Sequence, residues 1–371
     1  MELPINENPE FTEWLVREGV LVEPFVLIDV GVQDGEDGRW RVLGDHLVVH
    51  GFDPIAEVVE ALSTLNHGKV HRHYHWMALG NMDGEGSFYF NPAKPTESSM
   101  YRMEVGPCGI EIVQELRKVP IRRLDSLLAE GLVPQADFMK IDVEGFEQDV
   151  LLGSRELLRG GVLGLQTETN FGLSPPYPKS HFVTMAEIAL EHHLVVFDLA
   201  FNRIPRASFQ RALVRKGFTP IAEHDAVGRP ATVNVLFARD LIEEADRPSH
   251  YPHPCPCRAV SANQLIKSMI ICELHALNDV ALDIAERFAD RLGAHLDVER
   301  AVRLLADPDC LTNQYHTGYR RQLRAQQRAY EESTSWRITA PLRWTKLLFG
   351  APRAALGEYG ARARSRGRSV T

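Results

Sequence analysis

The chain has 371 residues, of which 44% are hydrophobic, so it can form one large α/β domain with additions, or two domains. Its formal net charge of −9 argues against a general nucleic-acid-binding protein. The cysteines are few and scattered, at Cys108, Cys255, Cys257, Cys272 and Cys310, which excludes a disulfide-rich scaffold. The acidic N-terminus is unlike a signal peptide, and no apolar run reaches the roughly 18 residues of a membrane-spanning helix. We therefore expect a cytoplasmic protein.

The first half of the chain contains four segments with the residue types of strands. They are residues 24–31, 46–53, 70–79 and 86–90. The first is a continuous apolar run, as expected in the middle of a parallel sheet, and it opens into a loop with three glycines. The second ends on Asp53, after which residues 55–65 have the pattern of an amphipathic helix. Residues 100–116 show no clear pattern.

The second half alternates strands with helices. The predicted strands are residues 137–143, 162–168, 194–199 and 231–238, and the predicted helices are residues 147–158 and 185–192. Strands that alternate with helices predict a mainly parallel sheet that is covered on both faces. The expected fold is therefore a doubly wound α/β domain.

The composition changes at residues 248–257, a proline-rich linker. Beyond it, helices are expected at about residues 263–292, 297–306 and 312–332. Residues 336–371 carry a net charge of +7, which leaves −16 for the rest of the chain. The predicted organisation is an N-terminal extension (1–21), an α/β domain (22–247), a C-terminal α-helical appendage (248–335) and a basic amphipathic tail (336–371).

The chain is organised around residues 137–147, where a short apolar strand ends in two carboxylates and a glycine before a helix begins. Open α/β sheets bind ligands at the carboxyl ends of their strands. Asp142 and Glu144 are two residues apart, so on a strand their side chains would leave the same face. The plainer interpretation is that the two acids merely begin a helix.

A second candidate site is Asp29-x-Gly31-x-x-x-Gly35, which follows the first buried strand. Glycines allow a backbone to approach a nucleotide-type cofactor, and an acid at the end of the next strand can bind ribose hydroxyls. Asp53 stands at that position. A purely structural turn is the alternative.

Together these segments resemble the FkbM-type family of S-adenosylmethionine-dependent methyltransferases. The resemblance is carried by residues 28–35, 51–54, 78–84 and 123–147, and it covers about residues 22–240. It implies a Rossmann-like class I methyltransferase sheet. The chain departs from the family at Val32-Gln33, where Ala-Asn is usual, so Gln33 would supply the amide.

The resemblance also implies roles for single residues. It places the methionine moiety at Asp29, Gly31 and Gly35, the ribose on Asp53, the adenine near Ala78 and Leu79, and Asp142 opposite the reactive methyl group. An acidic surrounding suits a positively charged sulfonium. The nearby acids Asp34, Glu36 and Asp37 would repel the pyrophosphate of a dinucleotide.

Methyl transfer to a hydroxyl requires a base or a metal ion, because a hydroxyl has a pKa far above 7. Asp142 is the candidate for either role, and His181 is a second candidate base. Asp142, Glu168 and Asn170 offer oxygen ligands for magnesium, with a metal-free base as the favoured alternative.

The alternating residues His71, His73 and His75 predict either a zinc site or, as we prefer, an exposed strand face.

The tail around residues 332–344 resembles a segment at the ends of bacterial enzymes that build or methylate cell-surface glycans. Its mixture of Trp, Leu, Arg and Lys suits an interfacial helix at the inner face of an anionic membrane, and packing against the helical appendage is the alternative.

We therefore expect O-methylation of a hydroxyl on a sugar of a surface polysaccharide or its precursor, in polysaccharide biosynthesis. The expected partners are a small-molecule or glycan acceptor and glycan-assembly enzymes, without nucleic acid, and a homo-oligomer is left open. The alternatives are a non-catalytic scaffold of a glycan-assembly complex and an NAD-dependent oxidoreductase.

Overall fold

A computed structural model of the protein describes residues 3–66, 71–103, 113–172, 180–206, 208, 209, 213, 215, 216, 228–246 and 260–306. All of them lie in the compact unit formed by residues 1–313. The predicted linker at residues 248–257, the helix at 312–332 and the basic tail lie outside the described residues.

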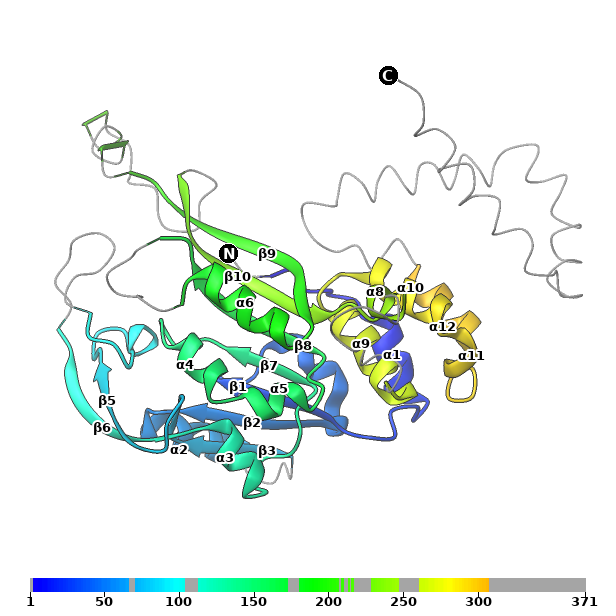
Figure 1. The fold of residues 1–371 in the computed structure, drawn as a ribbon, viewed down its shortest axis with the longest axis horizontal. Coiled ribbons are helices and arrows are strands. Elements are labelled where there is room, and N and C mark those ends of the chain that lie inside the picture. The colour runs from blue at the N-terminus through cyan, green and yellow to red at the C-terminus, as the bar shows by residue number, and fades with distance from the viewer. Residues whose placement is uncertain are drawn as a thin grey trace, which may run out of the picture. The chain divides into compact units, whose positions relative to one another are not determined.

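The centre of the fold is a seven-stranded sheet in the order β3-β2-β1-β7-β8-β10-β9 (Figure 1). Its strands are β1 (Phe25–Val30), β2 (Leu47–Asp53), β3 (Arg72–Trp76), β7 (Phe138–Ile141), β8 (Gly164–Asn170), β9 (Leu194–Ile204) and β10 (Arg229–Arg239). β1, β2, β3, β7 and β8 pair in parallel, whereas β10 runs antiparallel to both β8 and β9. The predicted doubly wound α/β fold is confirmed.

A three-stranded sheet in the order β4-β6-β5 lies in the chain between β3 and β7. It consists of β4 (Ala78–Leu79), β5 (Gly84–Phe90) and β6 (Glu115–Arg122). The segment predicted as one strand over residues 70–79 is therefore two strands in different sheets. The chain turns between them at Met77, whose N–H donates to the Asp53 carbonyl at 3.2 Å.

Helices cover both faces of the large sheet, because the strands bury side chains on both sides. The helices are α1 (Glu10–Arg17), α2 (Ala56–Leu65), α3 (Leu124–Ala129), α4 (Glu147–Leu152), α5 (Arg155–Arg159), α6 (Phe182–Glu191), α8 (Leu241–Asp246), α9 (Ala262–Leu274), α10 (Asn278–Arg287), α11 (Ala289–Leu292) and α12 (Val298–Leu305), with short 3-10 turns η1 (Gly38–His46) and η2 (Pro95–Glu97). In β1, Ile28 and Val30 pack with α3–α6, whereas Leu27 packs on the opposite face.

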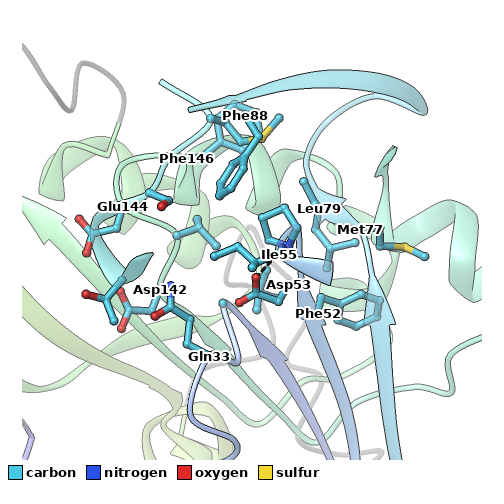
Figure 2. Close-up of a pocket in the computed structure, with 18 residues that line it drawn as sticks. Gln33, Phe52, Asp53, Ile55, Met77, Leu79, Phe88, Asp142, Glu144 and Phe146 are labelled. Atoms are coloured by element: carbon cyan, nitrogen blue, oxygen red, sulfur yellow. Dashed lines mark hydrogen bonds between the residues drawn. The ribbon is translucent and has the colours of Figure 1, made fainter. Parts of the chain in front are cut away.

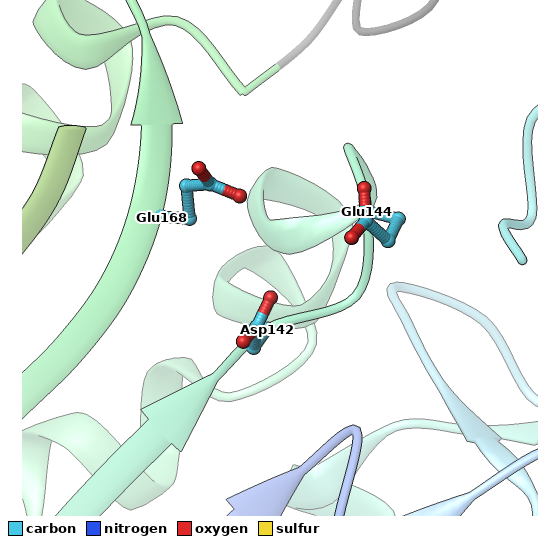
Figure 3. Close-up of side chains that lie close together, drawn as sticks. All are labelled: Asp142, Glu144 and Glu168. Carbon is cyan, nitrogen blue, oxygen red and sulfur yellow. The ribbon is translucent and has the colours of Figure 1, made fainter. Parts of the chain in front are cut away.

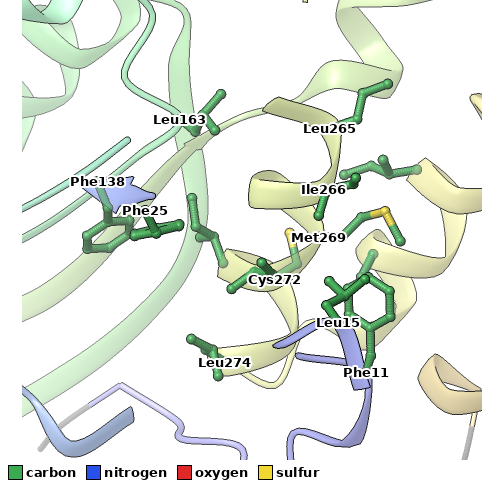
Figure 4. Close-up of a cluster of buried hydrophobic side chains, with 14 of the residues drawn as sticks. Phe11, Leu15, Phe25, Phe138, Leu163, Leu265, Ile266, Met269, Cys272 and Leu274 are labelled. Carbon is green, nitrogen blue, oxygen red and sulfur yellow. The ribbon is translucent and has the colours of Figure 1, made fainter. Parts of the chain in front are cut away.

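The helices beyond residue 260 belong to the same hydrophobic core as the sheet. Leu265, Met269 and Cys272 of α9 cluster with Phe25 of β1 and Phe138 of β7 (Figure 4). These helices, which the sequence analysis separates as an appendage, therefore complete one face of the sheet. The boundaries given above for the N-terminal extension, the α/β domain, the appendage and the tail remain predictions.

Two buried charged side chains of α9 fasten this helix to distant parts of the chain. Lys267 Nζ donates to the Pro24 carbonyl and to Asp137 Oδ2, both at 2.8 Å, and the same Asp137 oxygen accepts the N–H of Val26. Glu273 instead accepts hydrogen bonds from the first turn of α1.

Among the described residues, no helix has the length and apolar character needed to cross a membrane.

Candidate cofactor and acceptor site

A cavity opens at the carboxyl ends of β1, β2 and β7, where ligands bind in open α/β sheets. Of the cofactor-binding residues predicted from sequence, Gly31, Gln33, Asp53, Ala78, Leu79 and Asp142 line it. Asp29 and Gly35 do not. In Figure 2, Asp53 lies between the carboxylate side chains on one side and Leu79 and Met77 on the other.

The loop after β1 brings the backbone close to β7. Gly31 has φ +85°, and a Cβ atom there would lie 2.0 Å from the Asp142 carbonyl oxygen, so no other residue fits. Gly35 has φ +86° and its N–H donates to the Val32 carbonyl, which closes the same turn behind the cavity. The Gln33 side chain donates to the Pro95 carbonyl at 3.1 Å, so its amide already has a partner in the loop before Ser98.

Asp53 is buried at the end of β2, and one of its oxygens is committed to the protein. Oδ1 accepts the N–H of Ile55 at 2.8 Å. Burial raises the pKa of Asp53 to about 6, and this hydrogen bond acts against the rise. Its second oxygen is available to a hydroxyl donor, which is the role that the resemblance gives it.

The other wall of the cavity is apolar and comes largely from outside the seven-stranded sheet. Phe88 of β5 and Met100 face it, together with Ile55 and Phe146. Phe88 and Ile55 belong to a small buried cluster under the three-stranded sheet. Acids on one side and apolar side chains on the other form an amphipathic cavity, as expected for a ligand with polar and planar parts.

The predicted strand 137–143 ends earlier, at Ile141, and Asp142 and Glu144 lie in the turn that follows. Glu144 has φ +53°, an unfavourable conformation for a residue with a side chain. Several hydrogen bonds hold the turn: Glu147 Oε1 accepts the N–H groups of Val143 and Gly145 at 3.1 and 3.0 Å, and Ser99 Oγ donates to the Glu144 carbonyl at 2.7 Å.

Three carboxylates converge beside the cavity, of which Asp142 and Glu144 line it and Glu168 does not. Asp142, Glu144 and Glu168 each offer an oxygen atom that lies within 4.8 Å of the other two (Figure 3). Asp142 and Glu144 are thus neighbours as predicted, but the turn brings them together and not the alternation of a strand. Burial, followed by the charge of Asp142, raises the pKa of Glu168, and Asn202 donates to its Oε1 at 3.2 Å.

The other predicted site residues lie at the end of β8. Asn170 is buried, and its backbone N–H donates to the Ser180 carbonyl at 2.8 Å. His181 is the N-cap of α6, where its ring Nδ1 accepts the N–H of Val183 at 3.4 Å. His181 does not line the cavity.

Sequence reasoning missed two charged groups of the site. Lys140 Nζ lies 3.5 Å from Asp29 Oδ1 and 3.7 Å from Asp142 Oδ2, so one ammonium bridges both acids. Glu147 is buried and holds the turn around Glu144. Lys140 could have been predicted from its position in the strand, because it lies two residues before Asp142 and pairs with Asp29 across β1 and β7.

The residues present fit the cofactor that the resemblance implies. Asp29 is 1% exposed, and its Oδ1 makes no hydrogen bond among the described residues, so a buried acceptor atom stands at the rim of the glycine turn. Among the described residues, acids and neither arginine nor lysine line the cavity, which suits a positively charged sulfonium better than a pyrophosphate.

Comparison with known proteins agrees with this assignment. Residues 29–171 match the family model described as "Methyltransferase FkbM domain". A comparison with curated proteins finds no match.

Solved structures similar to this chain are found at low identity. They include the methyltransferase FkbM of Methylobacillus flagellatus KT (14% identity, 61% of this chain and 47% of that chain, TM-score 0.33), a putative sarcosine dimethylglycine methyltransferase of Galdieria sulphuraria (12%, 62% and 84%, 0.31) and Aeropyrum pernix fibrillarin with natively bound S-adenosyl-L-methionine (10%, 62% and 76%, 0.30). The chain thus spans about half the length of the Methylobacillus protein.

The family match confirms the resemblance that the sequence motifs indicated, over the part of the chain that contains β1, β2, β7 and β8. Residues 29–171 are therefore similar to the FkbM domain of methyltransferases.

Proposed function

We propose that the protein transfers a methyl group from S-adenosylmethionine to a hydroxyl oxygen, and that the acceptor hydroxyl binds among Asp142, Glu144 and Glu168. The observation that carries this proposal is the convergence of three carboxylate oxygens within 4.8 Å of one another, beside the cavity that Asp142 and Glu144 line. A hydroxyl must lose its proton when it is methylated, and carboxylates at hydrogen-bond distance can accept that proton.

The acids differ in what they offer an acceptor. Asp142 is the most open of the three, with 45% of its side chain exposed, so it can orient the hydroxyl by accepting its hydrogen bond. The raised pKa of Glu168 makes it the better proton acceptor, because a base works best when its pKa approaches the operating pH. We therefore assign the proton to Glu168 and the positioning of the hydroxyl to Asp142. His181 stays a prediction.

The cofactor, when bound, supplies the methyl group as a sulfonium electrophile. Asp53 would hold ribose hydroxyls through its uncommitted oxygen, and Phe88 and Phe146 would enclose the adenine beside Ala78 and Leu79. Because the reaction is an in-line displacement, the main task of these residues is to align donor and acceptor.

We propose a sugar-containing acceptor. The carboxylates continue into further polar side chains on β9 and β10: Asn202 donates both to Glu168 and to Thr232 Oγ1, at 3.2 and 3.0 Å. A row of donors and acceptors beside the reacting hydroxyl suits a ligand with several hydroxyl groups. The resemblance of the tail to segments of glycan-modifying enzymes supports a role in polysaccharide biosynthesis.

The first test is calorimetric titration with S-adenosylhomocysteine and, separately, with NAD. Binding of the former alone at micromolar concentration supports the proposal, and binding of NAD alone would replace it with an oxidoreductase. Methyl transfer to a panel of sugars and glycans would then be followed with radiolabelled cofactor.

The second test separates an enzyme from a scaffold and a base from a metal ion. Glu168→Gln and Asp142→Asn should each lower turnover by at least about 100-fold, as expected when a general base or its partner is removed. A scaffold would keep its function in cells with either change. Activity that survives EDTA supports metal-free proton transfer, and loss of activity that magnesium restores would favour the predicted magnesium at Asp142, Glu168 and Asn170.

We also propose peripheral contact with anionic membranes through residues 336–371, on the basis of their charge of +7 and interleaved apolar residues. Co-sedimentation with anionic and neutral vesicles tests this. Binding only to anionic vesicles, lost on deletion of the tail, is the expected result.

A further inference from the structure

We propose that Lys140 is a positioning residue of the cofactor site, and that its ammonium keeps the buried Asp29 carboxylate charged and oriented for a cationic group of the cofactor. The proposal rests on the proposed function, because the methionine part of S-adenosylmethionine carries the cation that Asp29 would bind. The inference starts from the placement of these two charges in the sheet.

The sheet register places the two side chains opposite each other. Asp29 of β1 and Lys140 of β7 are direct partners in a parallel pair, and both side chains leave the same face. The Nζ–Oδ1 separation of 3.5 Å makes an ion pair rather than a well-formed hydrogen bond. The Asp29 side chain is 2% exposed and the Lys140 side chain 23%, so water reaches the lysine and hardly reaches the acid.

Asp29 stands among other acids, and Lys140 is the cation that pairs with it, whereas Glu36 pairs with Arg72 and Asp37 with Arg39. The charged and titratable groups that act on Asp29 or Lys140 come from four segments: Glu36 and Asp37 from the loop after β1, Asp53 from β2, Tyr74 from β3, and Asp142 after β7. Burial raises the pKa of Asp29 to about 6, the charges of Asp142 and Glu36 act in the same direction, and Lys140 opposes them.

Loss of the lysine would therefore shift Asp29 toward its neutral form near pH 7. A neutral Asp29 has no charge for a cationic ligand, so the ligand would bind only after the acid had released its proton.

The arrangement also explains how a lysine can lie in a site for a positively charged cofactor. Nζ lies 3.5 Å from Asp29 and 3.7 Å from Asp142, so two carboxylates share one ammonium, and the trio keeps a net charge of −1 when all three groups are ionised. The lysine reduces the mutual repulsion of the acids without reversing the sign of the site.

The experiment compares two ligands across pH 5–8 by calorimetry. S-adenosylhomocysteine carries the amino-acid ammonium, whereas 5′-methylthioadenosine has the nucleoside and lacks the amino acid. The ratio of the two affinities isolates the contribution of Asp29, because Asp53 and the adenine wall contact the part that both ligands share.

In the wild-type protein, we expect this ratio to fall as the pH drops through about 6, the pKa of Asp29. In Lys140→Met the midpoint should move up by about one to three pH units, the usual effect of a neighbouring opposite charge, so the ratio at pH 7 falls about tenfold or more. Lys140→Arg should restore the wild-type midpoint.

Asp29→Asn is the matched control. Its ratio should be low and independent of pH, and adding Lys140→Met to it should change nothing further. An unchanged midpoint in Lys140→Met, or an equal loss of affinity for both ligands, would overturn the role of Lys140 while leaving the cofactor assignment intact. A wild-type protein that binds neither ligand would overturn the proposed function and this inference together.

If Lys140→Met fails to fold, Asp142→Asn provides an independent test with the opposite sign. The Asp142 charge raises the pKa of Asp29, so its removal should move the midpoint of the affinity ratio to lower pH. A midpoint that moves up, or does not move, would contradict the proposed charge balance.

Discussion

Among the almost completely buried carboxylates of the described residues, Glu273 and Asp29 have opposite relations to their surroundings. Glu273 is 0% exposed, and its oxygens accept the N–H of Phe11, the N–H of Thr12 and the Thr12 hydroxyl at 2.9, 2.7 and 2.6 Å. Asp29 is 1% exposed, and its Oδ1 makes no hydrogen bond among the described residues. The hydrogen bonds of Glu273 join two helices, whereas Asp29 Oδ1 has an ion pair with Lys140 and no hydrogen bond among the described residues.

The comparison shows that burial alone does not distinguish a structural acid from a functional one. Burial raises the pKa of Glu273 to about 7 and that of Asp29 to about 6. What differs is hydrogen bonding: the Glu273 oxygens accept hydrogen bonds from α1, whereas Asp29 Oδ1 has the ion pair with Lys140 and can still accept a hydrogen bond from a ligand.

The largest expected effect is the loss of stability when Glu273, the structural acid, is replaced. Glu273→Ala removes both acceptor oxygens and leaves the N–H groups of Phe11 and Thr12 without partners, which should lower the free energy of unfolding by about 3 kcal/mol. Chemical denaturation measures this. Thr12→Val, which removes the hydroxyl and keeps the N–H, should cost about 1 kcal/mol. Equal free energies of unfolding for Glu273→Ala and the wild type would contradict the structural role of Glu273.

Asp29→Asn should have the opposite effects: little change in stability and a large loss of cofactor affinity. The free energy of unfolding should stay within about 1 kcal/mol of the wild type, because the side chain makes no hydrogen bond that the fold requires, while affinity for S-adenosylhomocysteine falls about 10- to 100-fold through the loss of a charge-assisted contact. Denaturation and calorimetry on the same sample check both halves. A variant that unfolds readily would place Asp29 with the structural acids.

Stability should depend on pH through Glu273 in a known direction. Its pKa is about 7 in the folded protein and 4.5 ordinarily, so between these values the folded state holds a proton that the unfolded chain releases. Its contribution is complete below pH 4.5 and is lost as the pH rises to 7. The stability difference between wild type and Glu273→Ala should therefore shrink by about 3 kcal/mol over this range. A stability difference that instead grows as the pH rises would show that Glu273 is buried as the anion.

A buried histidine extends the comparison with the opposite sign and a smaller effect. His50 stacks on His73 and His75 at ring separations of 4.8 and 5.5 Å, and burial lowers its pKa to about 4. The folded state then binds fewer protons than the unfolded chain between pH 4 and 6.5, so its contribution is lost as the pH falls. His50→Gln should reduce acid sensitivity by about 1 kcal/mol over that range, measured by denaturation at pH 5 and 7.

Much of the fold could be predicted from sequence because its central strands are continuous apolar runs. β1 is buried along its whole length, and its residue pattern alone identifies it. β6 was missed, since Arg117 and Lys118 interrupt its apolar residues and only one of its faces is buried. α1 was missed because its burial depends on a partner helix more than 240 residues later in the chain.

The candidate site was predictable where motifs carry it and not where the tertiary fold does. Gly31, Asp53 and Asp142 belong to local patterns, and all three line the cavity. Phe88 and Met100 come from the three-stranded sheet, whose position no local pattern reveals. The sequence pattern predicted Glu144 as part of a strand. Its backbone instead has a positive φ, which the hydrogen bonds of Glu147 and Ser99 hold in place. This conformation turns the Glu144 carboxylate toward Glu168.

The link from Glu273 to Phe11 has a consequence for the order of folding. It joins residues 262 positions apart, and Lys267 reaches Asp137 over 130 positions. A growing chain that has just completed β10 still lacks the helix that covers Phe25 and Phe138, so this apolar surface stays exposed until α9 has left the ribosome. Contacts of such long range form slowly. Synthesis of α9 is therefore the step after which the nascent protein can close its core and escape aggregation.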